Sequence, residues 1–446
     1  MATLLVRNAQ ILVTMDPFRR EIAGGGFFVR DGVIEQVGGD LPDTADEILE
    51  ARGTVITPGL VNTHHHMYQS LTRAVPAGQD ALLFGWLKTL YPIWERYTPE
   101  DFRIAAQIAL SELALSGCTL TSDHQYVFPN GARLSDTIDG ARDLGLRFHP
   151  TRGSMSIGES KGGLPPDSMV EFEEDILEDC IDVIDQFHDP APGAMLRIGL
   201  APCSPFSVSK ELMWETALLA REKSVMLHTH LAENDEDIAY SQEKFGCSPG
   251  EYARSLGWIG DDVWHAHCVK LTGEEIDLFA RTKTGVAHCP CSNCRLGSGI
   301  APVRQMRDAG VPVALGVDGS ASNDSGNLLA DARQAMLLQR VANQADAMSA
   351  REALEIATLG GARVLGRPDL GSIEVGKYAD FVLWETNNLP MAGAWDPVAA
   401  LVLCGPVPAR EVRVGGKAIV REGRMTGIDE QKLIEKSSKA IARLMQ

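Results

Sequence analysis

The segment Val263–Pro290, VWHAHCVKLTGEEIDLFARTKTGVAHCP, contains a short apolar strand, a helix and a second apolar strand. The pieces VWHAHCV and GVAHCP fit strands, and EEIDLFARTK between them fits a helix with apolar residues on one side. Two neighbouring parallel strands need a crossover connection, which is usually a helix. This segment therefore predicts one strand–helix–strand unit of a parallel sheet.

The same alternation continues on both sides of this segment. Further strand-like pieces are LRIGLAP, VMLHTHLA and VPVALGVDG, and further helical pieces are ELMWETALLAREKS and NLLADARQAMLLQR. An earlier helix is predicted to begin at Thr98-Pro99-Glu100-Asp101 and to end at Gly117. Alternation over roughly 300 residues favours an α/β fold of the (β/α)8 barrel type over an open sheet. No G-x-G-x-x-G follows an early strand, which argues against a dinucleotide-binding fold.

The two ends of the chain differ from this middle part. The start reads as short strands, TLLVRNAQILVT and GGGFFVRDGVIEQVG, with a hairpin signal at Asp31-Gly32. The end also reads as strands: GSIEVGKYADFVLWE, ALVLCG and EVRVGGKAIVREG. We therefore expect residues 1–57 and 368–446 to form one small split β-sandwich domain, and residues 58–367 to form the barrel.

Composition limits the class of protein. The chain has 446 residues, of which 44% are hydrophobic, enough for a large core and a smaller second one. Its 41 basic and 60 acidic residues give a formal net charge of −19, which disfavours a nucleic-acid partner. We see neither a membrane span nor a signal peptide. Nine cysteines, an odd count, fit reduced thiols, and we expect a cytoplasmic protein.

Histidines carry the first sign of function, because all 11 fall between His64 and His288. Three strand-like pieces carry histidines two apart, and a fourth ends in an aspartate: His64/His66, His228/His230, His265/His267 and Asp318. Residues two apart on a strand point to one face, so each pair could enter one coordination sphere. Since barrel active sites lie at the carboxyl ends of the strands, the pattern indicates a metal site there.

Four motifs in this order identify a family resemblance: TPGLVNTHHHMYQSLTR, HTHLAEN, HAHCVKL and LGVDGSASND. The chain resembles the amidohydrolase superfamily, in its branch of aminohydrolases acting on purines, pterins and triazines. The resemblance implies metal-dependent hydrolytic deamination of an amino-lactam ring, with 8-oxoguanine, converted to urate and ammonia, as the expected substrate. Isoxanthopterin, guanine and hydroxytriazines are the alternatives, and homo-oligomers are expected. A ring-opening cyclic amidase and a non-catalytic metal-binding scaffold are the rival classes.

The resemblance also implies a ligand set of His64, His66, His230 and Asp318 around one divalent ion. Zinc is the expected metal, with iron(II) as an alternative. His65 should face away from the ion, and His228 becomes a neighbour or core residue. Two-metal members of the superfamily add a bridging lysine, but the lysines between these motifs lie in helical or loop context: Lys88, Lys161, Lys210 and Lys223.

Three residues match the positions that carry the chemistry. Asp318 would accept a proton from the attacking water, and His267 would hydrogen-bond that water and steady the tetrahedral intermediate. Glu233, three residues after His230, would protonate the ring nitrogen beside the attacked carbon. The alternative for Glu233 is an ordinary surface carboxylate at the start of a helix.

Two further residues are candidates for substrate binding. Gln69 stands where guanine deaminase-like relatives place a glutamine that reads the carbonyl edge of the ring, and otherwise it is a solvated loop residue. Arg152 could meet a substrate oxygen or form a structural salt bridge. The aromatic stretch from Phe84 to Tyr97 follows the first barrel strand and is expected to roof the ring or to pack as an ordinary lid.

The cysteine-rich segment HCPCSNC, His288–Cys294, suggests a second possible metal site. Its P-C-x-x-C half matches the cytidine-type zinc deaminases, but their H-x-E half is absent from this sequence. The segment matches instead an H-C-P-x-S-N segment of the amidohydrolases. We therefore expect a pocket-lining loop whose Cys291 and Cys294 do not hold metal, with His288 or Asn293 near the substrate.

Overall fold

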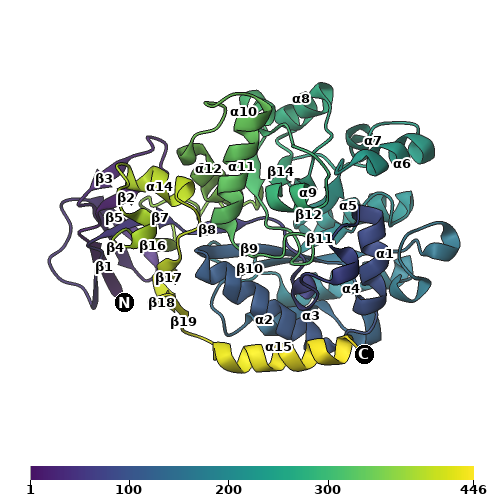
Figure 1. The fold of residues 1–446 in the computed structure, drawn as a ribbon, viewed down its shortest axis with the longest axis horizontal. Coiled ribbons are helices and arrows are strands. Elements are labelled where there is room, and N and C mark those ends of the chain that lie inside the picture. The colour runs from purple at the N-terminus through teal and green to yellow at the C-terminus, as the bar shows by residue number, and fades with distance from the viewer. Residues whose placement is uncertain (1) are drawn as a thin grey trace.

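A computed structural model describes residues 2–446, and an eight-stranded parallel barrel forms its centre (Figure 1). The strands pair in chain order: β8 (Leu60–Asn62), β9 (Cys118–Gln125), β10 (Arg147–Ser154), β11 (Gly199–Pro202), β12 (Met226–Leu231), β13 (Val263–His267), β14 (Gly285–His288) and β15 (Val313–Leu315). The first and last strands meet where the Thr63 amide donates to Leu315 O at 3.0 Å and the Asp318 amide donates to His64 O at 3.1 Å. These two hydrogen bonds close the barrel and bring His64 beside Asp318.

Helices connect the strands and cover the outside of the barrel (Figure 1). They are α2 (Pro99–Leu115), α3 (Leu134–Ala141), α4 (Glu173–Phe187), α5 (Lys210–Lys223), α6 (Asp235–Phe245), α7 (Pro249–Ser255), α8 (Gly273–Thr282), α9 (Pro290–Arg295), α10 (Val303–Ala309), α11 (Leu328–Ala342), α12 (Ala350–Ala357) and α13 (Leu359–Val364). The predicted start of α2 is confirmed, because the Thr98 amide and hydroxyl both donate to Asp101. The predicted barrel class is confirmed as well.

The interior of the barrel is filled below the site by apolar side chains. Val61, Leu120, Trp264, Ala287 and Ala314 from five strands form one buried cluster. The Trp264 indole donates to Thr63 O at 3.0 Å, which fixes the ring across the barrel axis. This layer forms a rigid floor for the polar residues at the carboxyl ends of the strands.

Strands from both chain ends form two further sheets, as predicted. One is β5-β4-β1-β6 and the other is β19-β18-β17-β16-β7-β2-β3. The bounds are β1 (Thr3–Arg7), β2 (Ile11–Val13), β3 (Glu21–Ala23), β4 (Gly26–Arg30), β5 (Val33–Gly38), β6 (Glu47–Glu50), β7 (Thr54–Pro58), β16 (Phe381–Glu385), β17 (Ala409–Val414), β18 (Lys417–Arg421) and β19 (Arg424–Met425). Asp31 and Gly32 have φ values of 48° and 84°, as a two-residue hairpin turn between β4 and β5 requires. The domain boundaries stay a prediction.

The structure differs from the sequence prediction at two places near the C-terminus. ALVLCG is not a strand, because it lies in α14 (Pro397–Leu403), where Asp396 accepts the amides of Val398 and Ala399 and caps the helix. A further helix, α15 (Glu430–Leu444), was not predicted and lies along α2 on the barrel (Figure 1). Its Arg443 forms an ion pair with Asp101. Within residues 2–446, none of the helices combines the length and apolar character that crossing a membrane requires.

Candidate active site

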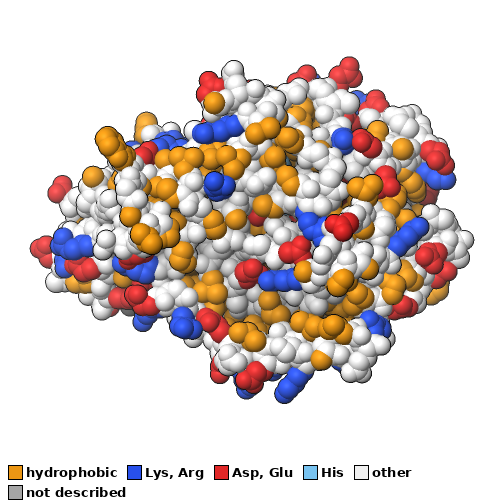
Figure 2. All heavy atoms as spheres, in the orientation of Figure 1, with side chains coloured by type: hydrophobic (Ala, Val, Ile, Leu, Met, Phe, Trp, Pro, Cys, Tyr) orange, Lys and Arg blue, Asp and Glu red, His pale blue; other side chains and the backbone are white. Residues whose placement is uncertain are grey.

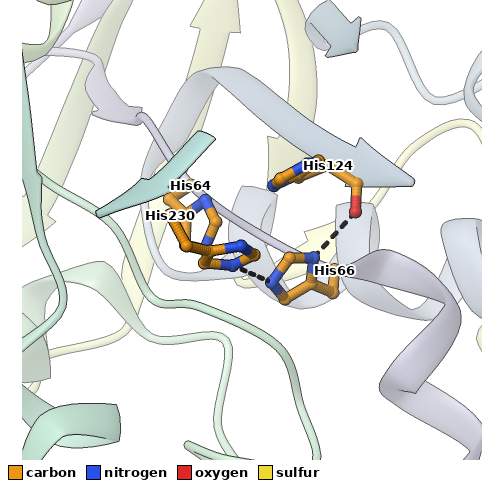
Figure 3. A group of neighbouring side chains, drawn as sticks. All are labelled: His64, His66, His124 and His230. Carbon is orange, nitrogen blue, oxygen red and sulfur yellow. Dashed lines mark hydrogen bonds between the residues drawn. The ribbon is translucent and has the colours of Figure 1, made fainter. Parts of the chain in front are cut away.

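The predicted ligand residues meet at the carboxyl ends of the barrel strands. His66 Nε2 lies 3.0 Å from His230 Nε2, and Asp318 Oδ1 lies 3.2 Å from His64 Nε2 and 3.3 Å from His66 Nε2. All four side chains are buried or nearly so. Figure 3 shows the rings of His66 and His230 facing each other, with His64 beside His230.

The outer nitrogens of two rings are held by backbone carbonyls. His66 Nδ1 donates to His124 O at 2.7 Å, and His230 Nδ1 donates to Cys203 O at 2.5 Å. A carbonyl oxygen can only accept a hydrogen bond, so each Nδ1 must carry the proton. In a neutral ring this leaves the lone pair on Nε2, which points into the cluster.

His64 is oriented through a second histidine. His64 Nδ1 lies 2.8 Å from His228 Nε2, and His228 Nδ1 donates to Trp264 O at 2.9 Å. The carbonyl places the His228 proton on Nδ1, so His228 Nε2 accepts the proton of His64 Nδ1. His64 Nε2 therefore also presents a lone pair to the cluster. His228, predicted to be a neighbour or core residue, fixes the orientation of the ring.

The electrostatics of the cluster fit a cation. Burial lowers the pKa of both His64 and His230 well below the usual range, which keeps these rings neutral. Burial disfavours the charged form of Asp318, but the charge of the neighbouring His267 helps to keep its pKa well below the usual range, so it stays a carboxylate. Lone pairs and a carboxylate oxygen facing one another at 3.0–3.3 Å repel unless a positive charge lies between them. The four residues could thus hold a divalent metal ion.

A further histidine stands beside this cluster and was missed in the sequence. Potential ligand atoms of His124 lie within 4.8 Å of those of His64, His66 and His230, and a second such group joins His64 and His230 to His267 and Asp318. His124 Nε2 donates to Ala201 O at 2.8 Å. The sequence feature that could have pointed to His124 is the Asp123-His124 pair at the carboxyl end of β9. The Asp123 carboxylate accepts the Met67 amide and fixes the turn after His66.

Two carboxylates flank His267 next to the cluster. His267 Nε2 lies 3.7 Å from Glu233 Oε2 and 3.8 Å from Asp318 Oδ2, and its Nδ1 donates to Asn293 Oδ1 at 2.9 Å. Burial raises the pKa of Glu233 to about 7, so this carboxyl group can both hold and release a proton near neutral pH. Glu233 is buried, and the reading as an ordinary surface carboxylate does not fit the structure.

The backbone is strained where these residues leave their strands. Ala232, His267 and Asp318 have φ values of 51°, 70° and 64°, in the left-handed region that non-glycine residues rarely adopt. This conformation turns His267 into the site, whereas His265 points to the outer side of the barrel and donates to Trp258 O at 2.9 Å. The expectation that His265 and His267 share one face is therefore wrong.

A small cavity of about 30 Å³ adjoins the cluster. Its lining consists of His66, Gln69, Leu83, Trp86, Leu87, Tyr126, Cys203, Phe206, His230, Glu233, His267, Leu296, Asp318 and Ser322. Leu83, Trp86 and Leu87 come from α1 (Leu83–Trp94), which forms the roof of the cavity. That this roof covers a substrate ring stays a prediction. Gln69, in the 3-10 turn η1 (Met67–Leu71), is buried, and its Oε1 accepts the Ala321 amide at 3.3 Å. It is not a solvated loop residue.

Arg152 lies elsewhere. Its guanidinium donates to Glu171 at 2.6 and 3.0 Å and to Asp179 at 2.8 Å, and it lies over the ring of Phe128. These partners line a separate cleft that does not include the histidine cluster. The structure does not bring Arg152 to the candidate active site, and its contacts are those of the structural salt bridge that the sequence left open.

The segment His288–Cys294 is not a loop, because Pro290–Arg295 forms the short helix α9. Cys294 is exposed and Cys291 is half-buried. Within the described residues, neither cysteine belongs to a group of potential metal ligands. Asn293 accepts from His267, and Ser292 donates to Asp318 Oδ2 at 2.5 Å. The segment supports the site through its polar residues rather than through its thiols.

A closed parallel barrel with a buried imidazole–carboxylate cluster at its strand ends defines a metal-dependent barrel hydrolase. The sequence of the chain specifies the family: residues 55–416 match the model of the amidohydrolase family. The chain therefore belongs to the amidohydrolase family, which is a metal-dependent family, and the predicted family membership is confirmed.

Individual relatives are similar over nearly the whole chain. The 8-oxoguanine deaminase of Pseudomonas aeruginosa is 44% identical over 95% of both chains. An isoxanthopterin deaminase of an unknown prokaryotic organism is 36% identical over 99% of this chain and 97% of its own length. The atrazine chlorohydrolase of Arthrobacter aurescens TC1, crystallised with zinc, superimposes with a TM-score of 0.94 at 35% identity, covering 98% of this chain and 100% of its own.

The site geometry predicts which residues retain metal. Metal analysis of the pure protein should find about one divalent ion per chain, because four ligand side chains close a single site. His230→Ala should lose the ion, and the Cys291→Ser/Cys294→Ser double variant should keep it. Two ions per chain, or a double cysteine variant that loses its ion while His230→Ala retains it, would contradict this assignment.

Proposed function

We propose that this protein is a hydrolytic deaminase of an amino-lactam heterocycle, with 8-oxoguanine, converted to urate and ammonia, as the best substrate. The observation that carries the proposal is the placement of two proton-carrying groups, Glu233 and His267, within 4 Å of each other at the metal-binding cluster. A non-catalytic metal-binding scaffold would have no use for a buried carboxyl group that lies beside His267 and lines the cavity.

We assign the metal to His64, His66, His230 and Asp318, with zinc as the expected ion and iron(II) as the alternative. A divalent ion held there would supply Lewis acidity that lowers the pKa of water toward about 7. The zinc in the crystallised atrazine chlorohydrolase supports this choice of metal.

The protein residues then move the protons. Asp318 accepts a proton from the attacking water, and His267, whose Nδ1 is committed to Asn293, presents Nε2 to the developing negative charge. Glu233 donates its proton to the ring nitrogen beside the attacked carbon and then helps to transfer a proton to the departing amino group, which leaves as ammonia. Because His267 lies between the two carboxyl groups, it can relay a proton from one to the other.

We propose that Gln69 recognises the lactam edge of the substrate ring. Its side-chain amide can accept from a ring N–H and donate to the adjacent ring carbonyl. The names of two relatives, 8-oxoguanine deaminase and isoxanthopterin deaminase, support a ring of this kind. Isoxanthopterin, guanine and hydroxytriazines present the same edge and are the alternative substrates. A ring-opening amidase is disfavoured, because the four candidate lysines lie in helices or 3-10 turns rather than at strand ends.

We also propose that the protein works in the cytoplasm as a homo-oligomer. The nine cysteines are all free within the described part of the chain, which supports a reducing compartment. The formal charge of −19 supports the absence of a nucleic-acid partner. The homo-oligomer rests on the family resemblance.

Substrate choice gives the first test of the function. Ammonia release measured across purines, pterins and triazines should show activity on 8-oxoguanine or a close lactam analogue, and weak or no activity on adenine and cytosine. Each unsatisfied buried polar group costs about 1–3 kcal/mol, so two mispaired groups should lower kcat/KM about a hundredfold or more. Equal turnover of adenine and 8-oxoguanine would show that the site does not read the lactam edge.

Gln69→Leu isolates the proposed contact. This variant should lose turnover of the lactam substrate by about a hundredfold, because the lactam edge is left without its partner, while its metal content stays that of the natural protein. Ammonia release and metal analysis on the same preparation check both expectations. Unchanged turnover would remove Gln69 from the substrate contacts.

Glu233→Gln tests the proton donor. Glutamine has almost the same shape but cannot transfer the proton, so kcat should fall by about 10²–10⁴ with the metal retained. Glu236→Gln, an exposed carboxylate in α6, is the matched control and should behave like the natural protein. An active Glu233→Gln variant would exclude the proposed acid.

A further inference from the structure

The roof of the cavity must move for a substrate to reach the site, a step that rests on the proposed function. The cavity measures about 30 Å³, whereas sites for small organic molecules usually occupy about 300–1,000 Å³. Three α1 side chains, which form its roof, and Leu296 are among the residues that line it. A heterocyclic ring therefore does not fit this volume, and side chains that line the cavity must move to admit one.

The segment that carries the roof lies in the long connection between β8 and α2. It contains the 3-10 turn η2 (Pro76–Gly78) and α1, and neither belongs to the repeating barrel. Trp86 Nε1 donates to Ala321 O at 3.0 Å, and the Phe84 and Phe206 rings lie 5.4 Å apart. These contacts hold the covering face of α1 against the barrel mouth.

Arg295 ties the beginning of this segment to the barrel. Its Nη1 donates to Gln79 O at 2.6 Å and its Nη2 to Gly78 O at 3.4 Å, while its Nε lies 3.4 Å from Asp324 Oδ2. The other oxygen of Asp324 accepts the Ala74 amide at 2.6 Å. One arginine and one aspartate thus hold both sides of η2, immediately before α1.

The residues around Arg295 contact the catalytic groups. Ser292 donates to Asp318, Asn293 accepts from His267, and Ser298 donates to Glu233 Oε1 at 3.4 Å. All three belong to α9 and the turn that follows it. The segment Ser292–Ser298 therefore contacts the proposed proton carriers with one set of side chains and the roof with another.

We propose that Arg295 is a positioning residue that latches α1 over the active site, so that the element aligning Glu233, His267 and Asp318 also holds the roof closed. Release of Gly78 and Gln79 from the guanidinium opens the cavity, and their recapture closes it around the bound ring. This role belongs to none of the ligand or proton-transfer positions assigned above.

The chain offers a matched control for this latch. Arg221 donates to Asp262 at 3.0 Å and to the carbonyls of Gly257 and Ile259 at 2.5 and 3.4 Å, on α5. It therefore loses the same kinds of contact when it is replaced by glutamine, but it contacts no part of the roof.

The first test measures hydrogen exchange in the metal-loaded protein without substrate. In Arg295→Gln, the amides of residues 76–94 should exchange about tenfold faster than in the natural protein, because hydrogen bonds to a charged group are lost. In Arg221→Gln these amides should be unchanged. Equal exchange of residues 76–94 in the two variants would overturn the latch. If Arg295→Gln does not fold, Asp324→Asn should give the same localised change.

The second test uses two buried cysteines as reporters. Cys203 lines the cavity beneath the roof, whereas Cys180 on α4 is buried away from it. With iodoacetamide, Arg295→Gln should label Cys203 about tenfold faster, with Cys180 unchanged. Parallel acceleration at both cysteines indicates general loosening and contradicts the latch. Both tests omit substrate, so an inactive protein that passes them refutes the proposed function alone, and an active one that fails them refutes the latch alone.

Discussion

The hydrogen bonds that close the barrel are the constraint on which the site depends. Thr63 and Leu315, and then His64 and Asp318, pair through their backbones at the junction of the first and last strands. These contacts join distant parts of the sequence and complete a parallel sheet, which has no free edge once it is closed. Closure also fixes the spacing between His64 and Asp318, so a slip in strand register would separate the cluster before it affected the outer helices.

The three imidazole rings of the cluster are oriented by hydrogen-bond acceptors that fix the position of the proton on each ring. Two backbone carbonyls and the His228 ring each force a proton onto the outer nitrogen of one histidine, which leaves three lone pairs facing a carboxylate. Without a cation this arrangement is unfavourable, and the positive φ values of Ala232, His267 and Asp318 add backbone strain at the same place. The apolar floor around Trp264 and the outer helices offset these costs, as expected where stability is given up for a preorganised site.

The sequence predicted what spacing can encode. Strand–helix alternation predicted the barrel, and histidines two apart indicated a metal site at the strand ends. The family resemblance then implied His64, His66, His230 and Asp318 as its ligands. The sequence did not reveal His124, whose backbone carbonyl orients His66, because any residue supplies such a carbonyl. The direction of His265 was mispredicted because φ at His267 breaks the alternation of the strand. The segment ALVLCG was predicted as a strand because a short apolar run is compatible with a strand or a helix. The Asp396 side chain caps the amides at its start and stabilises the helix.

Helical periodicity turns the two thiols of the cysteine-rich segment away from the candidate active site. After His288 the chain enters α9 at Pro290, and its side chains then follow a period of 3.6 residues rather than 2. Ser292 and Asn293 turn toward Asp318 and His267, whereas Cys291 and Cys294 turn toward α11, where the Cys291 amide donates to Asp331 and Cys294 contacts Gln334. The helix therefore separates the thiols from the polar groups, and only the polar groups reach the site.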